Sequence, residues 1–313
     1  MTTTDRPFDL LVVGEINPDL LLYGDVAPDF RQVEKRVDRA VLTVGSSSVI
    51  LACAAARLGL RVAFVGLCGP DLFGDFMLAE MQRRGVDTRW VQRRSDGSTG
   101  LSVILQKPDG ARAILTAEGL IPALRAEDVP DEALAAARHV HVSSFYLQRG
   151  LQPGLGDLFR RARAMGSTTS LDPNYDPDET WHSILPVLPE VDVFLPNAAE
   201  ARAIAGVDDV AAAARNLAAR GPLVVVKWDV RGALAVSPQG QQWHVPAVPA
   251  PTVVDAVGAG DNFDAGFLYG YLHGWPLARS LRLAAACGAL SLRGPGGTGA
   301  QPTLEEALAY VAA

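Results

Sequence analysis

Short apolar segments of strand length alternate along most of the chain with longer segments of helical periodicity. The apolar runs lie at 9–14, 61–66, 139–144, 168–173, 191–196 and 222–227. They are apolar at consecutive positions, as are strands that are covered on both faces. The helical candidates lie at 47–58, 71–84, 153–165, 198–205, 208–220, 261–273 and 277–293. This alternation predicts a single α/β domain over residues 1–313, with a doubly wound, mainly parallel sheet and helices on both faces.

Two early regions interrupt this alternation, and both favour β-structure. Residues 88–118 contain three strand-like segments separated by the turn sequences S-D-G and P-D-G, and residues 16–44 are rich in Val and Leu. Because the two regions flank the unit at 45–87, they can meet as a small β-sheet lid; alternatively, their strands extend the main sheet. A lid with an exposed sheet face favours pairing with a second copy, so we expect a homodimer through the lid.

Composition narrows the classes of partner. The formal net charge of −7 and the pI near 5.3 argue against a nucleic-acid partner, which needs a concentrated basic surface. Cys53, Cys68 and Cys287 lie far apart in apolar or small-residue runs, as is typical of buried free thiols in a reducing compartment. No run approaches the roughly 20 apolar residues of a membrane helix, and the start lacks a secretory signal pattern. We therefore expect a cytoplasmic protein with no membrane partner.

The sequence D-A-V-G-A-G-D at 255–261 stands at the start of a helical pattern. Gly258, Ala259 and Gly260 are small enough for a ligand to approach the backbone, and the unpaired N–H groups of a first helical turn attract phosphate or carboxylate. Asp261 has two interpretations. It can cap the helix, as Asp commonly does, or it can be a general base that takes the proton of an acceptor hydroxyl while the amides stabilise a transferring phosphoryl group. These residues alone leave both open.

This run, together with the sequence N-F-D-A-G-F that follows it at 262–267, resembles the C-terminal signature of the ribokinase-like, or PfkB, family of carbohydrate kinases. Four further segments resemble the family in the same order: G-E-I-N-P-D at 14–19, the segment 54–74, P-N-x-x-E at 196–200 and V-K-W-D-V-R-G at 226–232. The resemblance spans nearly the whole chain. It implies a ribokinase-like fold and ATP-dependent phosphorylation, with Mg²⁺, of a hydroxyl on a small sugar or sugar-like molecule.

The resemblance also implies roles for individual residues. It makes Asp261 the general base and the backbone amides of Gly258, Ala259 and Gly260 the anion hole. The residues it places at the substrate are Asn17, Asp19, Gly45, Ser46 and Asn174. The residues it places along the nucleotide are Asn197, Lys227, Gly232, Asp255 and Gly297. Glu200 belongs to the Asn-x-x-Glu motif that the family uses for magnesium and phosphate, so the resemblance gives it an indirect role at the metal.

Each of these segments also has a plain structural interpretation. Asn17 and Asp19 can be turn residues after a strand, and Asp-Pro-Asn at 172–174 is an ordinary turn sequence. Asn197 and Glu200 can cap and begin a helix. One of the three serines at 46–48 can cap the helix from about 48. Lys227 can be a solvated charge at a strand end.

The chain departs from the family pattern at two places. It has G-S-S-S-V-I at 45–50 where the family has G-G-x-x-x-N, so Ile50 stands where an Asn is typical and the transfer of ribose or fructose specificity is weakened. Ala256 replaces a common Thr beside Asp255, in a loop that shapes a monovalent-cation site in the family. Backbone carbonyls can form such a site without the Thr, so activation by K⁺ is compatible with the sequence.

Three other functions compete with the sugar kinase. One is a nucleoside kinase of the same fold. Another is a non-catalytic sugar-binding relative, suggested by the altered 45–50 segment, although the intact Asp261 opposes it. The third is a Rossmann dehydrogenase, which would need a G-x-G-x-x-G sequence after the first strand, and the chain has G-E-I-N-P-D there. The acceptor stays open among sugars, sugar acids, polyols and nucleosides.

Overall fold

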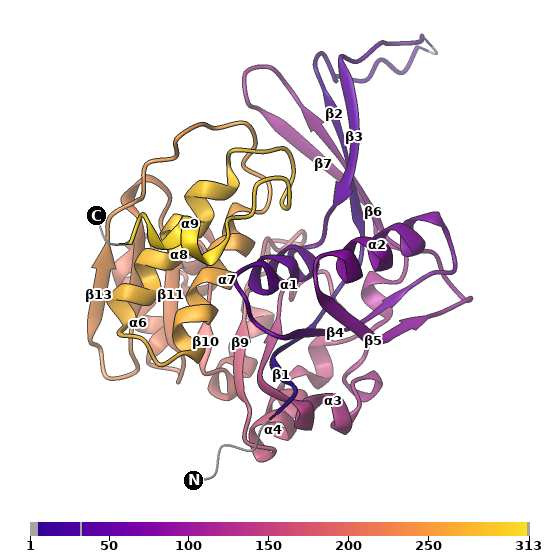
Figure 1. Cartoon of the computed structure of the whole chain (residues 1–313). Helices are drawn as coiled ribbons and strands as arrows, with labels where there is room; N and C mark the ends of the chain where they lie inside the picture. The colour runs from indigo at the N-terminus through magenta and orange to yellow at the C-terminus, as the bar shows by residue number, and fades with distance from the viewer. Residues whose placement is uncertain (1–5, 32, 312–313) are drawn as a thin grey trace.

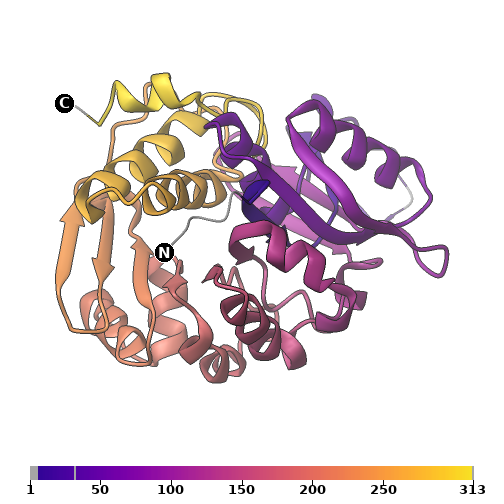
Figure 2. The ribbon, with the colours of Figure 1, turned by 60° about the horizontal axis from the view of Figure 1, so that its bottom comes forward.

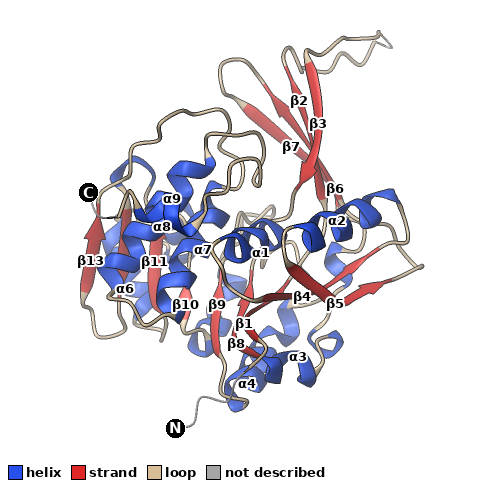
Figure 3. Ribbon diagram, viewed as in Figure 1, coloured by secondary structure: helices blue, strands red, loops and turns tan. Residues whose placement is uncertain are grey.

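The computed structural model describes residues 6–31 and 33–311, and within them the chain forms two separate sheets (Figures 1 and 3). The strands of the main sheet are β1 (Phe8–Val13), β4 (Val62–Cys68), β5 (Val86–Arg93), β8 (Ala137–Val142), β9 (Thr168–Leu171), β10 (Val193–Phe194), β11 (Leu223–Lys227), β12 (Ala233–Val236) and β13 (Gln242–Val245). The strands of the small sheet are β2 (Pro18–Tyr23), β3 (Arg39–Val44), β6 (Leu101–Gln106) and β7 (Arg112–Ala117). The predicted combination of a large, mostly parallel sheet and a smaller one is confirmed.

Helices cover both faces of the main sheet (Figure 2). They are α1 (Ser47–Arg57), α2 (Leu72–Arg83), α3 (Asp131–Ala136), α4 (Leu155–Ala164), α5 (Ala198–Ala205), α6 (Val210–Ala218), α7 (Ala259–Leu272), α8 (Leu277–Ser291) and α9 (Leu304–Leu308). One apolar core packs α3, α4, α5 and α6 on one face, and a second packs α1, α2, α7 and α8 on the other. This explains why the strand sequences are apolar at consecutive positions. No helix in the described part of the chain is long and apolar enough to cross a bilayer.

The order of the main sheet, β13-β12-β11-β10-β9-β8-β1-β4-β5, places a change of direction at β1. From β1 the chain adds β4 and then β5 on one side, and it returns to add β8 on the other side of β1. The connections that leave the carboxyl ends of β1 and β8 therefore diverge, and this is where ligands bind in open α/β sheets. At the far edge, β12 and β13 run antiparallel to their neighbours, a hairpin that the sequence pattern did not predict.

The small sheet, in the order β3-β2-β6-β7, projects from the body as the predicted lid (Figure 1). Residues paired across strands share a face of a sheet, so the register gives the lid one polar row and one apolar row. The polar row is Thr43, Asp19, Ser102 and Thr116. The apolar row, on the opposite face, is Leu42, Leu20, Val103 and Leu115.

One part of the predicted lid is wrong. Residues 88–93 belong to β5, which pairs in parallel with β4 at the edge of the main sheet, so the second lid segment is the β6–β7 hairpin. Trp90 of β5 packs edge to face on Phe8 of β1, with ring centroids 5.7 Å apart. An edge strand is half-buried, as a lid strand is, and both show the same alternation of polar and apolar residues. The sequence pattern could not tell them apart.

A continuous set of hydrogen bonds links β8 and β9 in the interior. The ring nitrogens of His139 contact the hydroxyls of Thr168 and Ser170, and those of His141 contact Ser170 and Ser143, all at 2.7 Å. Both histidines are fully buried, and burial lowers the pKa of each imidazole to about 3. Both rings are therefore neutral, and their polar atoms are satisfied without water.

Candidate active site

The start of α7 offers free backbone amides beside a tight contact between two loops. Gly258 precedes the helix with a left-handed φ of 74°, and a Cβ there would lie 2.5 Å from Cα of Gly297, so this approach requires glycine. In the described structure the N–H groups of Gly258 and Gly260 have no hydrogen-bond acceptor, whereas that of Ala259 donates a long bond of 3.4 Å to Ala256 O. The segment is half-exposed. It has the properties of an anion site.

Asp261 lies in the first turn of α7, but Gly258 is the N-cap and no side chain caps the helix, so the capping interpretation of Asp261 is wrong. The residue is 7% exposed. Burial raises the pKa of the Asp261 carboxyl well above its usual range, and the charge of Asp172 raises it further, while Lys227 and the Ser47 hydroxyl oppose the rise. A carboxyl with a raised pKa binds a proton more readily than an ordinary aspartate, as a general base must.

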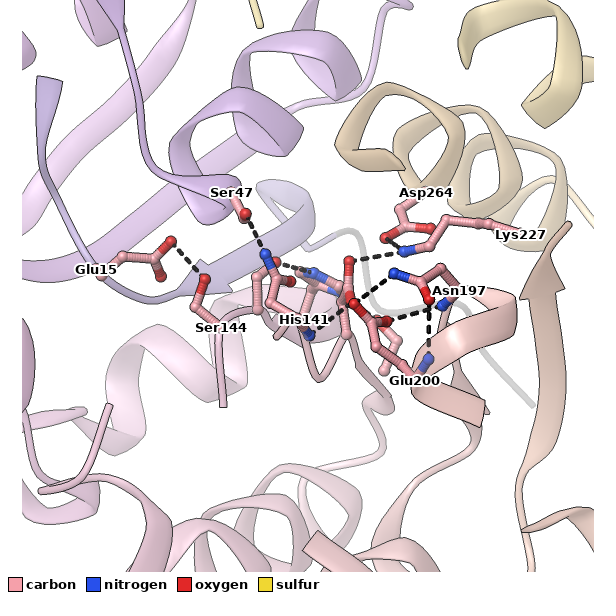
Figure 4. A network of polar contacts seen from close by, with 12 residues as sticks. Glu15, Ser47, His141, Ser144, Asn197, Glu200, Lys227 and Asp264 are labelled. Carbon is pink, nitrogen blue, oxygen red and sulfur yellow. Dashed lines mark hydrogen bonds and ion pairs between the residues drawn. The ribbon is translucent and has the colours of Figure 1, made fainter. Parts of the chain in front are cut away.

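Lys227, the last residue of β11, contacts the side-chain carboxyl groups of Asp172, just after β9, and Asp264, in α7. Its Nζ lies 2.8 Å from Oδ2 of Asp172 and 3.0 Å from Oδ2 of Asp264 (Figure 4). Its side chain is 13% exposed, so the interpretation of Lys227 as a solvated charge is wrong. The sequence analysis missed Asp264. A signal was present, because a carboxylate three residues after Asp261 is unexpected in an otherwise apolar helix.

Asn197 and Glu200 form a capping box at the start of α5, so their structural interpretation is confirmed. Both oxygens of Glu200 are engaged: Oε2 accepts from Asn197 N at 2.8 Å, and Oε1 accepts from Asn197 Nδ2 at 2.6 Å (Figure 4). Burial raises the pKa of Glu200 to about 7, and the charge of Asp172 contributes to the rise. In the described residues no three His, Cys, Asp or Glu side chains are arranged to hold a metal ion. A Mg²⁺ ion bound together with a nucleotide would take most of its ligands from phosphates and water, as Mg²⁺ commonly does.

Glu15, which the sequence analysis missed, organises the segment where the chain departs from the family pattern. Its buried carboxylate accepts hydrogen bonds from Ser46 Oγ at 3.0 Å, Ser48 Oγ at 2.6 Å and Ser48 N at 3.2 Å. It also accepts one from Ser144 Oγ at 2.9 Å (Figure 4). Ser46 has a left-handed φ of 66° and caps α1 by accepting from Val49 N, so one serine is the predicted cap. Glu15 thus joins the ends of β1 and β8 to the start of α1.

Ser47 is the serine of this segment that lies toward the base. Its Oγ accepts a hydrogen bond from Nδ2 of Asn174 (Figure 4), and the same hydroxyl lowers the pKa of Asp261. Asn174 has a left-handed φ of 53°, and its backbone N–H donates to Oδ1 of Asp172 at 3.2 Å. The structure therefore brings Asn174, predicted at the substrate, close to Asp261.

Asn17 and Asp19 lie where the lid joins the body. Asp19 is part of β2, so its interpretation as a turn residue is wrong, whereas Asn17 precedes the strand. Asn17 Nδ2 donates to Ser102 Oγ at 3.2 Å and weakly to Asp19 Oδ1 at 3.5 Å. A Cβ on Gly45 would overlap the Asp19 carboxylate, so Gly45 lies directly against it. Burial raises the pKa of Asp19 to about 7, and the charges of Asp255 and Glu15 add to the rise.

The remaining predicted nucleotide residues do not form one group. Asp255 accepts from Gly296 N at 2.9 Å and Val257 N at 3.0 Å, which fixes the loop before α7. Gly297 packs on Ile50, and its carbonyl accepts from Asn262 Nδ2 at 2.9 Å. Ile50 is therefore a packing residue behind the anion site. Gly232 lies apart in the β11–β12 turn with a φ of 90°, where a Cβ would overlap the backbone near Val245.

Comparison with known proteins identifies the family. A model described as pfkB family carbohydrate kinase matches residues 8–304. A sugar kinase of Archaeoglobus fulgidus, described as uncharacterized, is 32% identical over 74% of this chain and 93% of its own length. A 5-dehydro-2-deoxygluconokinase of Geobacillus thermodenitrificans is 26% identical over 96% of this chain and 92% of its own.

A solved structure agrees with these matches. The ribokinase of Arabidopsis thaliana, in complex with ribose and ATP, superposes with a TM-score of 0.86 over 97% of this chain and 98% of its own, at 22% identity. At this identity the likeness concerns the fold, and the predicted ribokinase-like fold is confirmed. The family match covers nearly the whole chain, as the resemblance in the sequence did. The chain therefore belongs to the PfkB family of carbohydrate kinases.

Proposed function

We propose that the protein transfers the γ-phosphoryl group of ATP to a hydroxyl of a small sugar-like molecule, with Asp261 as the general base. The observation that carries this proposal is the start of α7, where a buried carboxyl of raised pKa lies beside half-exposed backbone amides, two of which, at Gly258 and Gly260, have no acceptor among the described residues. Asp261 takes the proton of the attacking hydroxyl, and the amides of residues 258–260 stabilise the charge on the transferred group. In-line transfer needs little more from the protein than this positioning.

The nucleotide is assigned from the family and from the character of the site. The Arabidopsis neighbour was solved with ATP, and a neighbour from E. coli with ATP and Mg²⁺. Asp255 fixes the loop before α7, and Lys227, whose backbone pairs with Asn197, bonds to Asp264 in the same helix. These contacts support a start of α7 that is held in place to receive a polyphosphate. Mg²⁺ would arrive with the nucleotide and supply charge neutralisation. We expect Glu200 to reach it through water, because each Glu200 oxygen already accepts a hydrogen bond from Asn197.

The acceptor is assigned to the polar row of the lid. Asp19 and Ser102 face the body from neighbouring strands, and Asn17 and Asn174 lie at the lid base and beside the catalytic aspartate. Carboxylate, hydroxyl and amide groups that lie this close together can form hydrogen bonds to several hydroxyls of one acceptor molecule at once. The Geobacillus relative is named a 5-dehydro-2-deoxygluconokinase. An acceptor screen should therefore include 5-dehydro-2-deoxygluconate, 2-keto-3-deoxygluconate, ribose, fructose, inositol and nucleosides.

The test combines this screen with a variant of the base. Coupled detection of ADP should reveal at least one acceptor that depends on ATP, and Asp261→Asn should lower kcat about 10²–10⁴-fold, the usual contribution of a general base. Asp209→Asn is the matched control, because Asp209 is an exposed N-cap of α6 and Asn caps equally well. Unchanged turnover in Asp261→Asn, with a parent-like melting temperature, would remove the proposed role of Asp261. ATP consumption that no acceptor stimulates would contradict the kinase assignment.

We also propose that the apolar row of the lid pairs with the same row of a second copy. Leu115 is 60% and Leu42 is 38% exposed on this face, and a one-layer sheet leaves such a face uncovered. Light scattering should give twice the mass of the chain, and Leu115→Glu should reduce it to that of one copy. A monomeric mass in the parent would refute this pairing.

A further inference from the structure

Lys227, Asp172 and Asp264 meet directly beneath the proposed base. They come from the ends of β11 and β9 and from the second turn of α7, and Lys227 Nζ contacts both carboxyls at 3.0 Å or less. Asp172 is 3% exposed and Asp264 is fully buried. Charged groups so far from water need matched partners.

The carboxyl groups of Asp172 and Asp264 differ in how many of their oxygens have a hydrogen-bond donor. Asp172 accepts from Lys227 through Oδ2 and from Asn174 N through Oδ1, so both of its oxygens have donors. Asp264 accepts from Lys227 through Oδ2, but its buried Oδ1 has no donor in the described structure. A buried oxygen without a donor costs more free energy in a carboxylate than in a neutral carboxyl, so protonation of Asp264 is the less costly state. One cation therefore faces one carboxylate and one neutral carboxyl.

The directions of the pKa shifts agree with one charged and one neutral carboxyl group in the cluster. Burial raises the pKa of Asp264 well above its usual range, against the effect of Lys227, and a hydrogen bond with Asp172 supports the rise. For Asp172 burial acts in the same direction, but Lys227 and the hydrogen bond from Asp264 outweigh it and the net pKa is lowered. Both directions favour Asp264 as the carboxyl that carries the proton.

The cluster is close enough to act on the base. Asp261 and Asp264 are three residues apart in α7, which places them on the same face of the helix. A Cβ on Gly260, which precedes Asp261, would lie 3.7 Å from Nζ of Lys227, so the ammonium passes under the first turn. The other charged groups that act on Asp261 are Glu15, at the end of β1, and Lys227 itself.

We propose that Lys227 and Asp172 form a buried ion pair, with Asp264 as its neutral third member, and that this cluster positions Asp261 and sets its proton affinity. The inference rests on the proposed function, because it assigns the cluster to the base of that reaction. Asp172 supplies the negative charge near Asp261, Lys227 limits its effect, and Asp264 ties α7 to the pair without adding a second charge. All three are positioning residues, and none needs to touch the substrate.

The test compares two isosteric substitutions in the full chain. Asp172→Asn removes a charge, so the acid limb of the kcat/KM profile should move to lower pH by about one unit or more, the effect of removing a nearby like charge. Asp264→Asn replaces a neutral carboxyl by a neutral amide, so the acid limb should keep its position whatever happens to kcat. Lys227→Met should move the limb the opposite way from Asp172→Asn.

A direct readout separates this inference from the kinase assignment itself. Carboxyl ¹³C NMR of aspartate-labelled protein, with each signal assigned by its loss in the matching variant, should show Asp264 protonated and Asp172 charged at neutral pH. If Asp172→Asn fails to fold, the double variant Asp172→Asn/Lys227→Met removes both charges and should restore folding. Equal shifts of the acid limb in both Asn variants, no shift in either, or a charged Asp264 signal would each overturn the proposal. Loss of kinase activity in the parent would leave the NMR result standing and would refute only the proposed function.

Discussion

The phosphate end of the site, around the start of α7 and Lys227, and the acceptor end, around Asp19 and Asn17, differ in how far their charged groups are already paired. Lys227 has two carboxyl partners within 3.0 Å. By contrast, the Asp19 carboxylate is 5% exposed, and its hydrogen-bond partner among the described residues is the Asn17 amide at 3.5 Å. Charged groups are thus buried at both ends, but at the phosphate end Lys227 is paired with groups of opposite charge, and at the acceptor end Asp19 is not.

This difference indicates a division of labour between the two ends. A buried carboxylate without donors costs free energy, and a bound acceptor with hydroxyl groups removes that cost. The phosphate end is assembled before any ligand arrives, as electrostatic stabilisation of a transition state requires. We therefore expect the ligand to complete the acceptor end and the lid to decide which acceptor is used.

Gly258→Ala should give the largest effect, because it tests whether the phosphate end must be assembled in advance. The new Cβ would meet the backbone of Gly297, displace the first turn of α7 and lower kcat about 10²–10³-fold, the cost of losing an oxyanion donor. Gly156→Ala in α4, where a Cβ meets nothing within 4 Å, is the matched control in steady-state assays. Parent-like turnover of Gly258→Ala would show that this end tolerates rearrangement.

Asp19→Asn tests the other end. The amide keeps the size of the side chain but loses a charged acceptor, so KM for the acceptor should rise about 10–100-fold, as expected for a hydrogen bond to a charged group. KM for ATP should not change. Asp25→Asn, which alters an exposed carboxylate after the same strand, should leave both constants unaltered. A parallel rise in both KM values would contradict the separation of the two ends.

The pH dependence of the acceptor KM separates the ends further. Because the pKa of Asp19 is raised to about 7, this carboxyl becomes protonated and loses its charge as the pH falls through about 7. Below that pH the acceptor KM should rise by up to about tenfold per unit, and Asp19→Asn should abolish the dependence. Glu200, also with a pKa raised to about 7, lies at the phosphate end, so its titration should appear in the ATP KM.

Ser47→Ala should give the smallest effect, because Ser47 lies between the two ends. Its hydroxyl lowers the pKa of Asp261 and accepts from Asn174. Without it, the acid limb of the kcat profile should move to higher pH by about half a unit, the size expected for one hydrogen bond to a carboxylate. Movement to lower pH would mean that Ser47 does not stabilise the charged base.

The sequence predicted the parts of the fold and site that depend on local pattern. The alternating strands and helices, the glycines before α7 and the Asn197–Glu200 pair are each visible within a few residues. The role of Glu15 could not be predicted, because its partner Ser144 lies 129 residues away in the sequence. Lys227 and Asp264 likewise become partners only when β11 and α7 pack together.

The hydroxyls and imidazoles that link β8 and β9 can order their hydrogen bonds in only two ways. A neutral imidazole carries one N–H, so if His139 donates to Thr168 it must accept from Ser170, and His141 must then donate to Ser170 and accept from Ser143. In the second arrangement every donor is reversed. A mixed arrangement would leave a buried hydrogen or lone pair without a partner. The tautomers of the two histidines are therefore a single binary choice, and the chain of hydrogen bonds from Thr168 to Ser143 has one dipole whose direction is set for all its members at once.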